Sequence, residues 1–123
     1  MKILILDDSA FMQKIITKSM EEHIPDAQLF VGASGQDGLI IYEKENPDLI
    51  VTDLLMPLMT GQEFITIIRK TDLLVKIIVI TADIQKTVRE EIEALGVIAF
   101  VNKPLTGERI EQLFNTIKGC FHV

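Results

Sequence analysis

The chain has 123 residues, of which 48% are hydrophobic and 24% charged, and its formal net charge is −6. This length and composition predict one folded domain over residues 1–123 and exclude a disordered chain. The acidic balance argues against nucleic-acid binding, and no apolar stretch is long enough for a membrane span or a signal peptide, so we expect a cytoplasmic protein without membrane insertion.

Short apolar runs alternate with amphipathic stretches along the whole chain, which predicts repeated strand–helix units and a parallel sheet. The first strand is expected over residues 2–6, where apolar residues follow one another without alternation, as in strands buried on both faces. Ser9 can cap the helix that follows. A weaker second strand over residues 28–32 leads to Ser34, which together with Asp37 can begin the next helix.

The second half of the chain repeats this pattern. Strands are expected over residues 48–52, 76–80 and 97–101, and a helix should follow each of them. Gly96 is placed to end the fourth helix in a left-handed conformation, and Thr106 to cap the fifth helix. Apolar residues at helical spacing are expected to face the core, namely Phe11, Met12, Ile15, Ile16, Met20, Leu39, Ile40, Tyr42, Phe64, Ile65, Ile67, Ile68, Ile84, Val88, Ile92, Leu95, Ile110, Leu113, Phe114 and Ile117.

Five polar residues follow the predicted strands at the points where these end: Asp7, Asp8, Asp53, Thr81 and Lys103. The carboxyl ends of parallel strands share one edge of an open sheet, and α/β proteins bind their ligands at that edge. Three carboxylates, a hydroxyl and an ammonium gathered there predict a site for a divalent metal and a phosphoryl group.

Each residue type fits that chemistry. Asp7 and Asp8 are adjacent carboxylates whose burial is costly unless a cation such as Mg²⁺ offsets their charge. Asp53 can act as a nucleophile toward phosphorus, giving an aspartyl-phosphate. Thr81 can hydrogen-bond a phosphoryl oxygen, and Lys103 can place a positive charge on it. Taken singly, Asp7 and Asp8 fit a solvated turn or helix cap equally well, and Asp53, Thr81 and Lys103 fit turns or helix caps better than a site. A coincidence of all five at successive strand ends favours the site.

Together the motifs resemble the receiver domain of two-component response regulators. They are Asp7-Asp8, the segment Asp53-Leu-Leu-Met-Pro57-Leu-Met-Thr-Gly61, Thr81-Ala82 and Lys103-Pro104. The resemblance covers essentially the whole chain and is greatest to stand-alone chemotaxis-type (CheY-like) receivers, since little sequence follows the fifth predicted helix. It implies a doubly wound (βα)5, flavodoxin-like three-layer sandwich with strand order 2-1-3-4-5, an order for which a chemotaxis receiver is a known example.

The resemblance also implies a role for each matching residue. Asp53 would accept a phosphoryl group from a histidine kinase, and Asp8, Asp53 and the backbone carbonyl of Leu55 would ligate Mg²⁺, with Asp7 helping through water. Such a protein promotes its own phosphorylation and slow dephosphorylation but is not a multiple-turnover enzyme. Residues with a switching role would be Thr81, Phe100, Lys103 and Pro104, the last after a cis peptide bond.

The signalling surface implied by the resemblance is formed by the fourth helix, the fifth strand and the fifth helix. It would bind a downstream protein target or a phosphatase, and the protein would be a monomer or weak dimer. Two positions are expected to tune the lifetime of the phosphoryl group. Leu55 should crowd water out, and Asp83 should disfavour an added anion.

Two other functions share part of this pattern. A phosphatase of the haloacid-dehalogenase type also forms an aspartyl-phosphate with Mg²⁺, but it would carry Asp-x-Asp after the first strand, where this chain has Asp7-Asp8-Ser9. A receiver-like adaptor that works without phosphorylation remains an alternative, although such modules usually lose the acceptor, a metal carboxylate or the lysine. Multiple turnover of a phosphomonoester would indicate the phosphatase, and failure to take up phosphate would indicate the adaptor.

Overall fold

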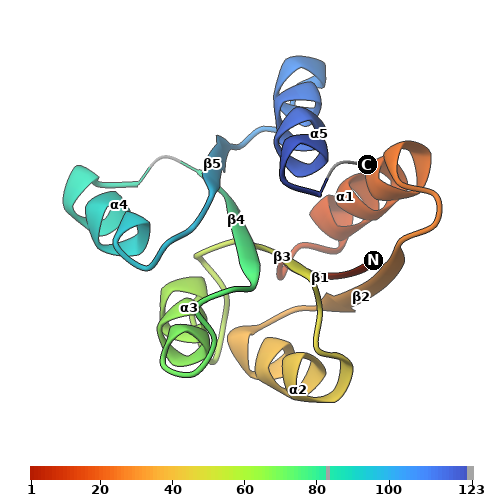
Figure 1. Ribbon diagram of the computed structural model, residues 1–123. Coiled ribbons are helices and arrows are strands. Elements are labelled where there is room, and N and C mark those ends of the chain that lie inside the picture. Colours follow the sequence, from red (N-terminus) through yellow and green to blue (C-terminus); the bar gives the residue numbers. More distant parts are fainter. Residues whose placement is uncertain (83, 122–123) are drawn as a thin grey trace.

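The computed structural model describes residues 1–82 and 84–121, which form five strands and five helices in strict alternation (Figure 1). The strands are β1 (Lys2–Leu6), β2 (Gln28–Gly32), β3 (Leu49–Thr52), β4 (Lys76–Thr81) and β5 (Ala99–Asn102). The helices are α1 (Ala10–His23), α2 (Gly35–Glu45), α3 (Gly61–Arg69), α4 (Lys86–Glu93) and α5 (Gly107–Phe121). Neighbouring strands all pair in parallel in the order β2-β1-β3-β4-β5, which confirms the expected topology.

The sheet is the middle of three layers. In Figure 1, α1 and α5 cover one face of the sheet, and α2, α3 and α4 cover the other. Because successive strand residues point to opposite faces, Ile3 and Ile5 of β1 enter the core on the α1/α5 side, while Leu4 and Leu6 enter the core on the opposite side. Burial of β1 on both faces explains its uninterrupted apolar sequence.

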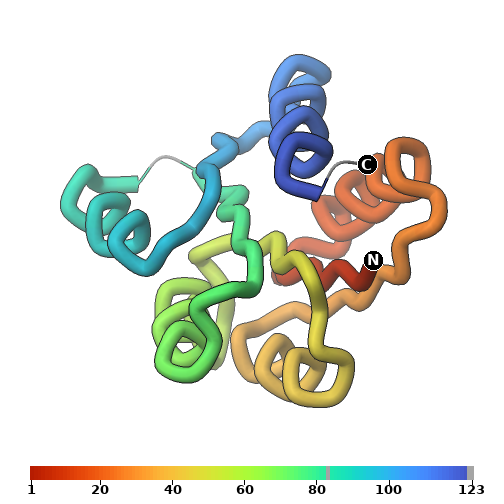
Figure 2. Tube along the Cα trace, viewed as in Figure 1, coloured from red at the N-terminus to blue at the C-terminus, as the bar shows by residue number. Residues whose placement is uncertain are grey.

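Helices α1 and α5 pack against each other on the face of the sheet that they share. Figure 2 shows α1 and α5 side by side, and the His23 ring stacks on the Phe114 ring with centroids 4.1 Å apart. Among the described helices, none is long and apolar enough to cross a membrane.

Side-chain caps begin four of the helices. The hydroxyls of Ser9, Ser34 and Thr106 each accept a hydrogen bond from a backbone N–H three residues later, which confirms the three expected caps. Before α3, Thr60 and Glu63 form a reciprocal capping box. The signature of this box, Thr-x-x-Glu before an apolar run, is visible in the sequence.

Glycine is required where α3 begins. A Cβ atom on Gly61 would lie 2.0 Å from the carbonyl oxygen of Asp53 and 2.9 Å from the Cα of Leu54. The start of α3 therefore presses directly on the backbone that carries Asp53. At Gly96, φ is +79°, which confirms the left-handed end expected for the fourth helix.

A polar network joins α2, α3 and the end of α4 at the other end of the sheet. The Arg69 guanidinium donates to the carbonyl oxygens of Leu95 (2.6 Å), Gly96 (3.3 Å) and Asp72 (3.0 Å). The Tyr42 hydroxyl donates to the Asp72 carboxylate. Arg69 thus satisfies carbonyls that the α4 C-terminus leaves unpaired, and it places a cation at the negative end of that helix.

Three predictions about helix faces were wrong. Phe11, Ile40 and Ile67 were expected in the core, but their exposed fractions are 72%, 67% and 38%. Each of the three is next to another apolar residue in the sequence. Neighbouring residues on a helix point about 100° apart, so when one of the two faces the sheet, the other turns away from it.

Strand boundaries also differ from the prediction. The fifth strand begins at Ala99, which pairs with Ile78, and it ends at Asn102, although residues 97–101 were expected. The apolar run at 97–98 lies before the regular ladder, where Ile98 N–H donates to the Ile77 carbonyl (2.8 Å). The third strand begins one residue later than expected, at Leu49, and the fourth extends to include Thr81.

Candidate functional site

The ends of the central strands fix the backbones of the acidic residues. Asp7 follows β1 and donates its N–H to the Gly32 carbonyl of β2 (3.1 Å), while Asp53 follows β3 and donates to the Leu6 carbonyl of β1 (2.9 Å). The parallel ladders therefore continue one residue beyond the strands. Asp7 and Asp53 are buried, with 1% and 6% of their surface exposed, whereas Asp8 is exposed.

Lys103 lies between two of these carboxylates. Its ammonium donates to Asp53 Oδ2 at 2.7 Å and to Asp7 Oδ2 at 2.8 Å. Its backbone N–H donates to the Thr81 carbonyl at 2.8 Å, so the loop after β5 is tied to the end of β4. The pairing with Asp53 was expected from the family resemblance, and the pairing with Asp7, which is only 0.1 Å longer, was not.

The two carboxylates stabilise the charged form of this lysine. Burial alone would lower the pKa of Lys103, but the hydrogen bonds and negative charges of Asp53 and Asp7 outweigh it and raise this pKa above its ordinary value. Lys103 therefore stays an ammonium throughout the neutral range, where it offsets part of the negative charge of the site.

The Asp53 carboxylate is oriented at both oxygens. Oδ2 receives the Lys103 hydrogen bond, and Oδ1 accepts from the backbone N–H of Leu54 (2.7 Å) and, at longer range, of Leu55 (3.4 Å). Asp7 is held in a similar way, because its Oδ1 accepts from the Ser9 N–H at 2.9 Å while its Oδ2 faces Lys103.

The three carboxylates suit a hard divalent cation. Asp7, Asp8 and Asp53 each offer an oxygen, and these oxygens all lie within 4.8 Å of one another. Mg²⁺ binds oxygen ligands, usually one or two carboxylates together with water. Lys103 contributes only one positive charge against three carboxylates, so the group retains a net negative charge that favours a cation.

Thr81 supplies an unpaired hydroxyl next to this group. The residue is 1% exposed, and its Oγ1 has no hydrogen-bond partner among the described residues. A buried polar atom without a partner is uncommon and costs stability, so it points to a function at that position.

The remaining residues named from the sequence lie around this centre. Phe100 on β5 is half-buried, and the Arg89 guanidinium of α4 sits over its ring, 4.7 Å from the centroid. The Lys103–Pro104 peptide bond is cis, as the resemblance implied. Leu55 is 68% exposed beside Asp53, and Asp83 lies outside the described residues, so its predicted role stays a prediction.

Comparison with known protein families identifies this arrangement. Residues 3–115 match the family described as "Response regulator receiver domain". The chain belongs to the response regulator receiver family. Receivers of the CheY-like type are signalling modules that work in two-component systems with histidine kinases.

Individual relatives agree with the family. The receiver is 32% identical over 120 residues to the chemotaxis protein CheY of Thermotoga maritima, a match that covers 94% of the chain and 96% of that protein. It is 33% identical over 111 residues to protein-glutamate methylesterase/protein-glutamine glutaminase 2 of Koribacter versatilis. That match covers 89% of the chain, which spans only 30% of this relative's length.

Solved structures support the fold. The signal receiver domain of a DNA-binding response regulator from Colwellia psychrerythraea superposes with a TM-score of 0.87 at 25% identity, covering 99% of the chain and 98% of that structure. The sheet order and the three layers of the receiver are thus those of a CheY-like domain.

One polar residue near the site was missed by the sequence analysis. The side-chain amide of Gln13 on α1 donates to the Asp7 carbonyl at 2.6 Å. Nothing in the sequence distinguishes this glutamine from other polar residues on a helix, because the contact depends on how α1 packs over the end of β1.

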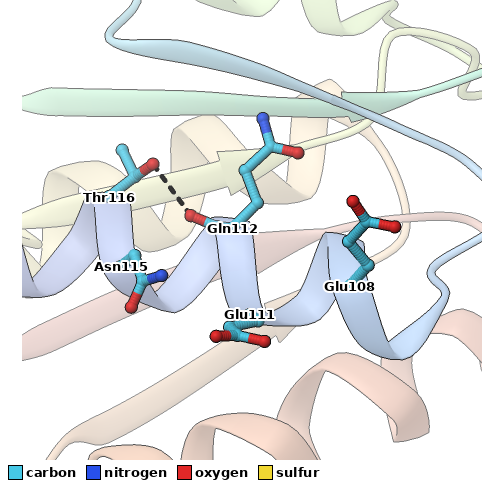
Figure 3. A pocket seen from close by; sticks show the side chains of 5 residues that line it. All are labelled: Glu108, Glu111, Gln112, Asn115 and Thr116. Atoms are coloured by element: carbon cyan, nitrogen blue, oxygen red, sulfur yellow. Dashed lines mark hydrogen bonds between the residues drawn. The ribbon is translucent and has the colours of Figure 1, made fainter.

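The receiver also carries a shallow hollow on α5, away from the carboxylates. Figure 3 shows its lining side chains projecting from successive turns of the helix: Glu108, Glu111, Gln112, Asn115 and Thr116. The Thr116 hydroxyl donates to the Gln112 carbonyl (2.9 Å) and so satisfies itself within the helix. This polar hollow lacks the converging charges of the edge site and belongs to the outer surface of α5.

Proposed function

We propose that this receiver accepts a phosphoryl group on Asp53 in a Mg²⁺-dependent step and signals through a surface that responds to it. The observation that carries the proposal is the grouping of an oriented, buried Asp53 with two further carboxylates, a shared Lys103 ammonium and an unpartnered Thr81 hydroxyl. Structural ion pairs alone do not account for that combination.

Asp53 would act as the nucleophile. Its Oδ2 forms the bond to phosphorus while the bond from phosphorus to the imidazole nitrogen of a phosphohistidine breaks, and the histidine leaves with that electron pair. The N–H of Leu54 on Oδ1 keeps the carboxylate in one orientation during this step. A Mg²⁺ ion held by Asp7, Asp8 and Asp53, with the Leu55 carbonyl proposed as a further ligand, would supply charge neutralisation at the phosphoryl oxygens.

Lys103 and Thr81 would bind the phosphoryl group once it is attached. Lys103 already contacts Asp53, so it can transfer a hydrogen bond to a phosphoryl oxygen with little movement. The Thr81 hydroxyl has no hydrogen-bond partner among the described residues, and the Thr81 carbonyl accepts from the Lys103 N–H. New contacts from both residues draw together the ends of β4 and β5, which lead into α4 and α5.

The surface of α4, β5 and α5 would carry the signal. Phe100 packs partly inside it, under Arg89, and a change at Thr81 reaches this ring because β4 and β5 are paired at Thr81 and Asn102. The proposed partners are a histidine kinase as donor and a downstream protein target or phosphatase as reader. Exposed Leu55 would slow attack by water on the phosphoryl group, giving a lifetime of minutes or longer rather than seconds.

Intact-mass analysis after incubation with acetyl phosphate tests the proposal. We expect one added phosphoryl group, stable in acid and labile in base, that requires Mg²⁺ and is absent from Asp53→Asn. Thr81→Ala should still take up the group, because its hydroxyl acts after the bond forms. The rate at which the phosphoryl group is hydrolysed would be followed in the same samples, for Thr81→Ala and for the wild type.

Two outcomes of this experiment would contradict the proposal. Absence of an adduct under every condition, with folded protein, would support a receiver-like adaptor that works without phosphorylation. An adduct that persists in Asp53→Asn would place the acceptor elsewhere and overturn the assignment of Asp53.

A further inference from the structure

The carboxylate of Asp8 is the least constrained member of the acidic group. Asp7 and Asp53 are buried and each accepts at least two hydrogen bonds, whereas Asp8 is exposed and its carboxylate accepts none from the described residues. The place of the Asp8 side chain therefore depends on the backbone that carries it, above all on the peptide unit between Asp7 and Asp8.

Gln13 holds that peptide unit. Its Nε2 donates to the Asp7 carbonyl oxygen at 2.6 Å, and this oxygen belongs to the Asp7–Asp8 peptide unit. The same Nε2 lies 3.5 Å from the Gly32 carbonyl oxygen. The Asp7 N–H donates to the same Gly32 carbonyl at 3.1 Å. The amide of Gln13 thus closes the β1–β2 ladder where the strands end and fixes the direction in which Asp8 leaves it.

The helix keeps Gln13 in place for this contact. Gln13 lies in the first turn of α1, its N–H donates to the Ser9 carbonyl at 2.9 Å, and its carbonyl accepts from the Thr17 hydroxyl at 2.8 Å. Ser9 both caps α1 and donates its N–H to Asp7 Oδ1. The start of α1 and the Asp7–Asp8 turn are therefore one hydrogen-bonded unit.

We infer that Gln13 is a positioning residue for metal binding, and that it acts through Asp8. This inference rests on the Mg²⁺ site of the proposed function but needs no phosphorylation. Residues that orient metal ligands from behind commonly change metal affinity by 10- to 100-fold when they are replaced. Because Gln13 fixes a backbone and not the carboxylate itself, we expect an effect of about tenfold, at the lower end of that range.

Mg²⁺ alone, without a phosphodonor, is the probe. Titrations of wild type and Gln13→Met, followed by backbone amide NMR shifts and by calorimetry, should give a dissociation constant about tenfold higher for the variant. Methionine keeps the length of the side chain and removes the donor. Thr116→Val is the matched control: it deletes a hydroxyl-to-carbonyl hydrogen bond of the same kind on α5, away from the acidic group, and its Mg²⁺ affinity should equal that of the wild type.

A double-mutant cycle shows whether Gln13 acts through Asp8. In an Asp8→Asn background, Gln13→Met should change Mg²⁺ affinity by less than about twofold, because the ligand it positions is gone. In Gln13→Met alone, the rate of phosphorylation by acetyl phosphate should return to the wild-type value at saturating Mg²⁺. A residue that merely supported the fold would lower this rate at every Mg²⁺ concentration.

Each outcome bears on a different claim. Unchanged Mg²⁺ affinity in folded Gln13→Met overturns the inference, and so does an equal loss in the Asp8→Asn background. Lack of Mg²⁺ binding by the wild type overturns the metal site of the proposed function instead. If Gln13→Met does not fold by circular dichroism, Gln13→Asn, whose amide is one carbon short of the Asp7 carbonyl, replaces it with the same expectations.

Discussion

Tyr42 has an environment that makes its ionisation measurable on its own. Burial, together with the hydrogen bond to Asp72 and the negative charge of that residue, raises the pKa of Tyr42 from 10.0 to about 12. The same hydrogen bond holds the pKa of Asp72 below its ordinary value. Since the chain contains one tyrosine and no tryptophan, the near-ultraviolet absorbance of tyrosinate reports on this residue alone.

The absorbance of tyrosinate should therefore rise with a midpoint of about pH 12 in the folded protein. The folded state holds the Tyr42 proton more tightly than the unfolded state. The stability that Tyr42 contributes is therefore fully present below pH 10 and is lost as the pH rises through the folded pKa of about 12. Asp72→Asn should move the midpoint back toward 10, while the exposed Asp26→Asn should not. A midpoint near 10 while circular dichroism still shows folded protein would contradict the hydrogen bond.

At this same scale, the sequence predicts the residues of the site but not all of their contacts. Asp7, Asp53, Thr81 and Lys103 could be found because each follows an apolar run, and the ends of parallel strands converge by topology. The second contact of Lys103, with Asp7, depends on a side-chain rotamer that no spacing rule specifies. The role of Gln13 is hidden for a similar reason, since it requires the exact packing of α1.

Among the elements, α4 is supported unequally at its two ends. Its C-terminal end is bound by two hydrogen bonds from Arg69, to the carbonyl oxygens of Leu95 and Gly96. At the N-terminal end, Gln85 makes no side-chain cap. Motion of this helix is therefore easier at the end that follows β4 than at the end that precedes β5.

Arg69→Met should loosen the C-terminal end of α4. Carbonyls of Leu95 and Gly96 lose charge-assisted hydrogen bonds, so we expect a loss of about 1–3 kcal/mol in the free energy of unfolding, measured by urea denaturation. Amide exchange should accelerate at residues 92–96. Lys86→Met, on the same helix with a side chain that is 90% exposed, should cost less than about 0.5 kcal/mol. Equal effects of the two variants would refute an anchoring role for Arg69.

The sequence predicts the presence of the strands and helices more reliably than it predicts which helix residues face the core. All five strands and all five helices follow from the alternation of apolar runs and amphipathic stretches. A strand buried on both faces has a continuous apolar sequence, whereas a helix buried along one stripe has apolar residues at every third or fourth position. Phe11, Ile40 and Ile67 were misplaced because their apolar stripes are wider than the surface that the sheet offers. The late start of β5 could not be predicted, since hydrophobicity continues into residues that precede the ladder.

At the scale of the whole molecule, negative charge is concentrated at the edge of the sheet where the strands have their carboxyl ends. The chain carries a formal net charge of −6, and three of its carboxylates converge on one point with Lys103 among them. The domain therefore folds against a local repulsion that a single ammonium offsets in part. A cation that binds the folded state alone must stabilise it by mass action.

Mg²⁺ should thus stabilise the folded wild type and raise its thermal midpoint. The gain in the free energy of unfolding reaches about 2.7 kcal/mol when the Mg²⁺ concentration is 100 times the dissociation constant. Lys103→Met leaves two buried carboxylates without their partner and should destabilise the protein by about 3–5 kcal/mol without Mg²⁺. Part of this loss should return when Mg²⁺ is added, and the Mg²⁺-induced shift should exceed that of the wild type. Scanning calorimetry at several Mg²⁺ concentrations measures both, and a smaller shift in the variant would refute the charge argument.

The unpartnered Thr81 hydroxyl sets a scale for how strongly the two states of the domain can differ in population. An unmade buried hydrogen bond costs about 1–3 kcal/mol, and within residues 1–82 and 84–121 the Thr81 Oγ1 atom bears this cost in the resting fold. A ligand oxygen that arrives within its reach removes the cost in one state only. Such a difference corresponds to a change of about 5- to 150-fold in the ratio of the two states. A hydroxyl that makes no hydrogen bond within the described residues of the resting protein can therefore decide how steeply the domain responds.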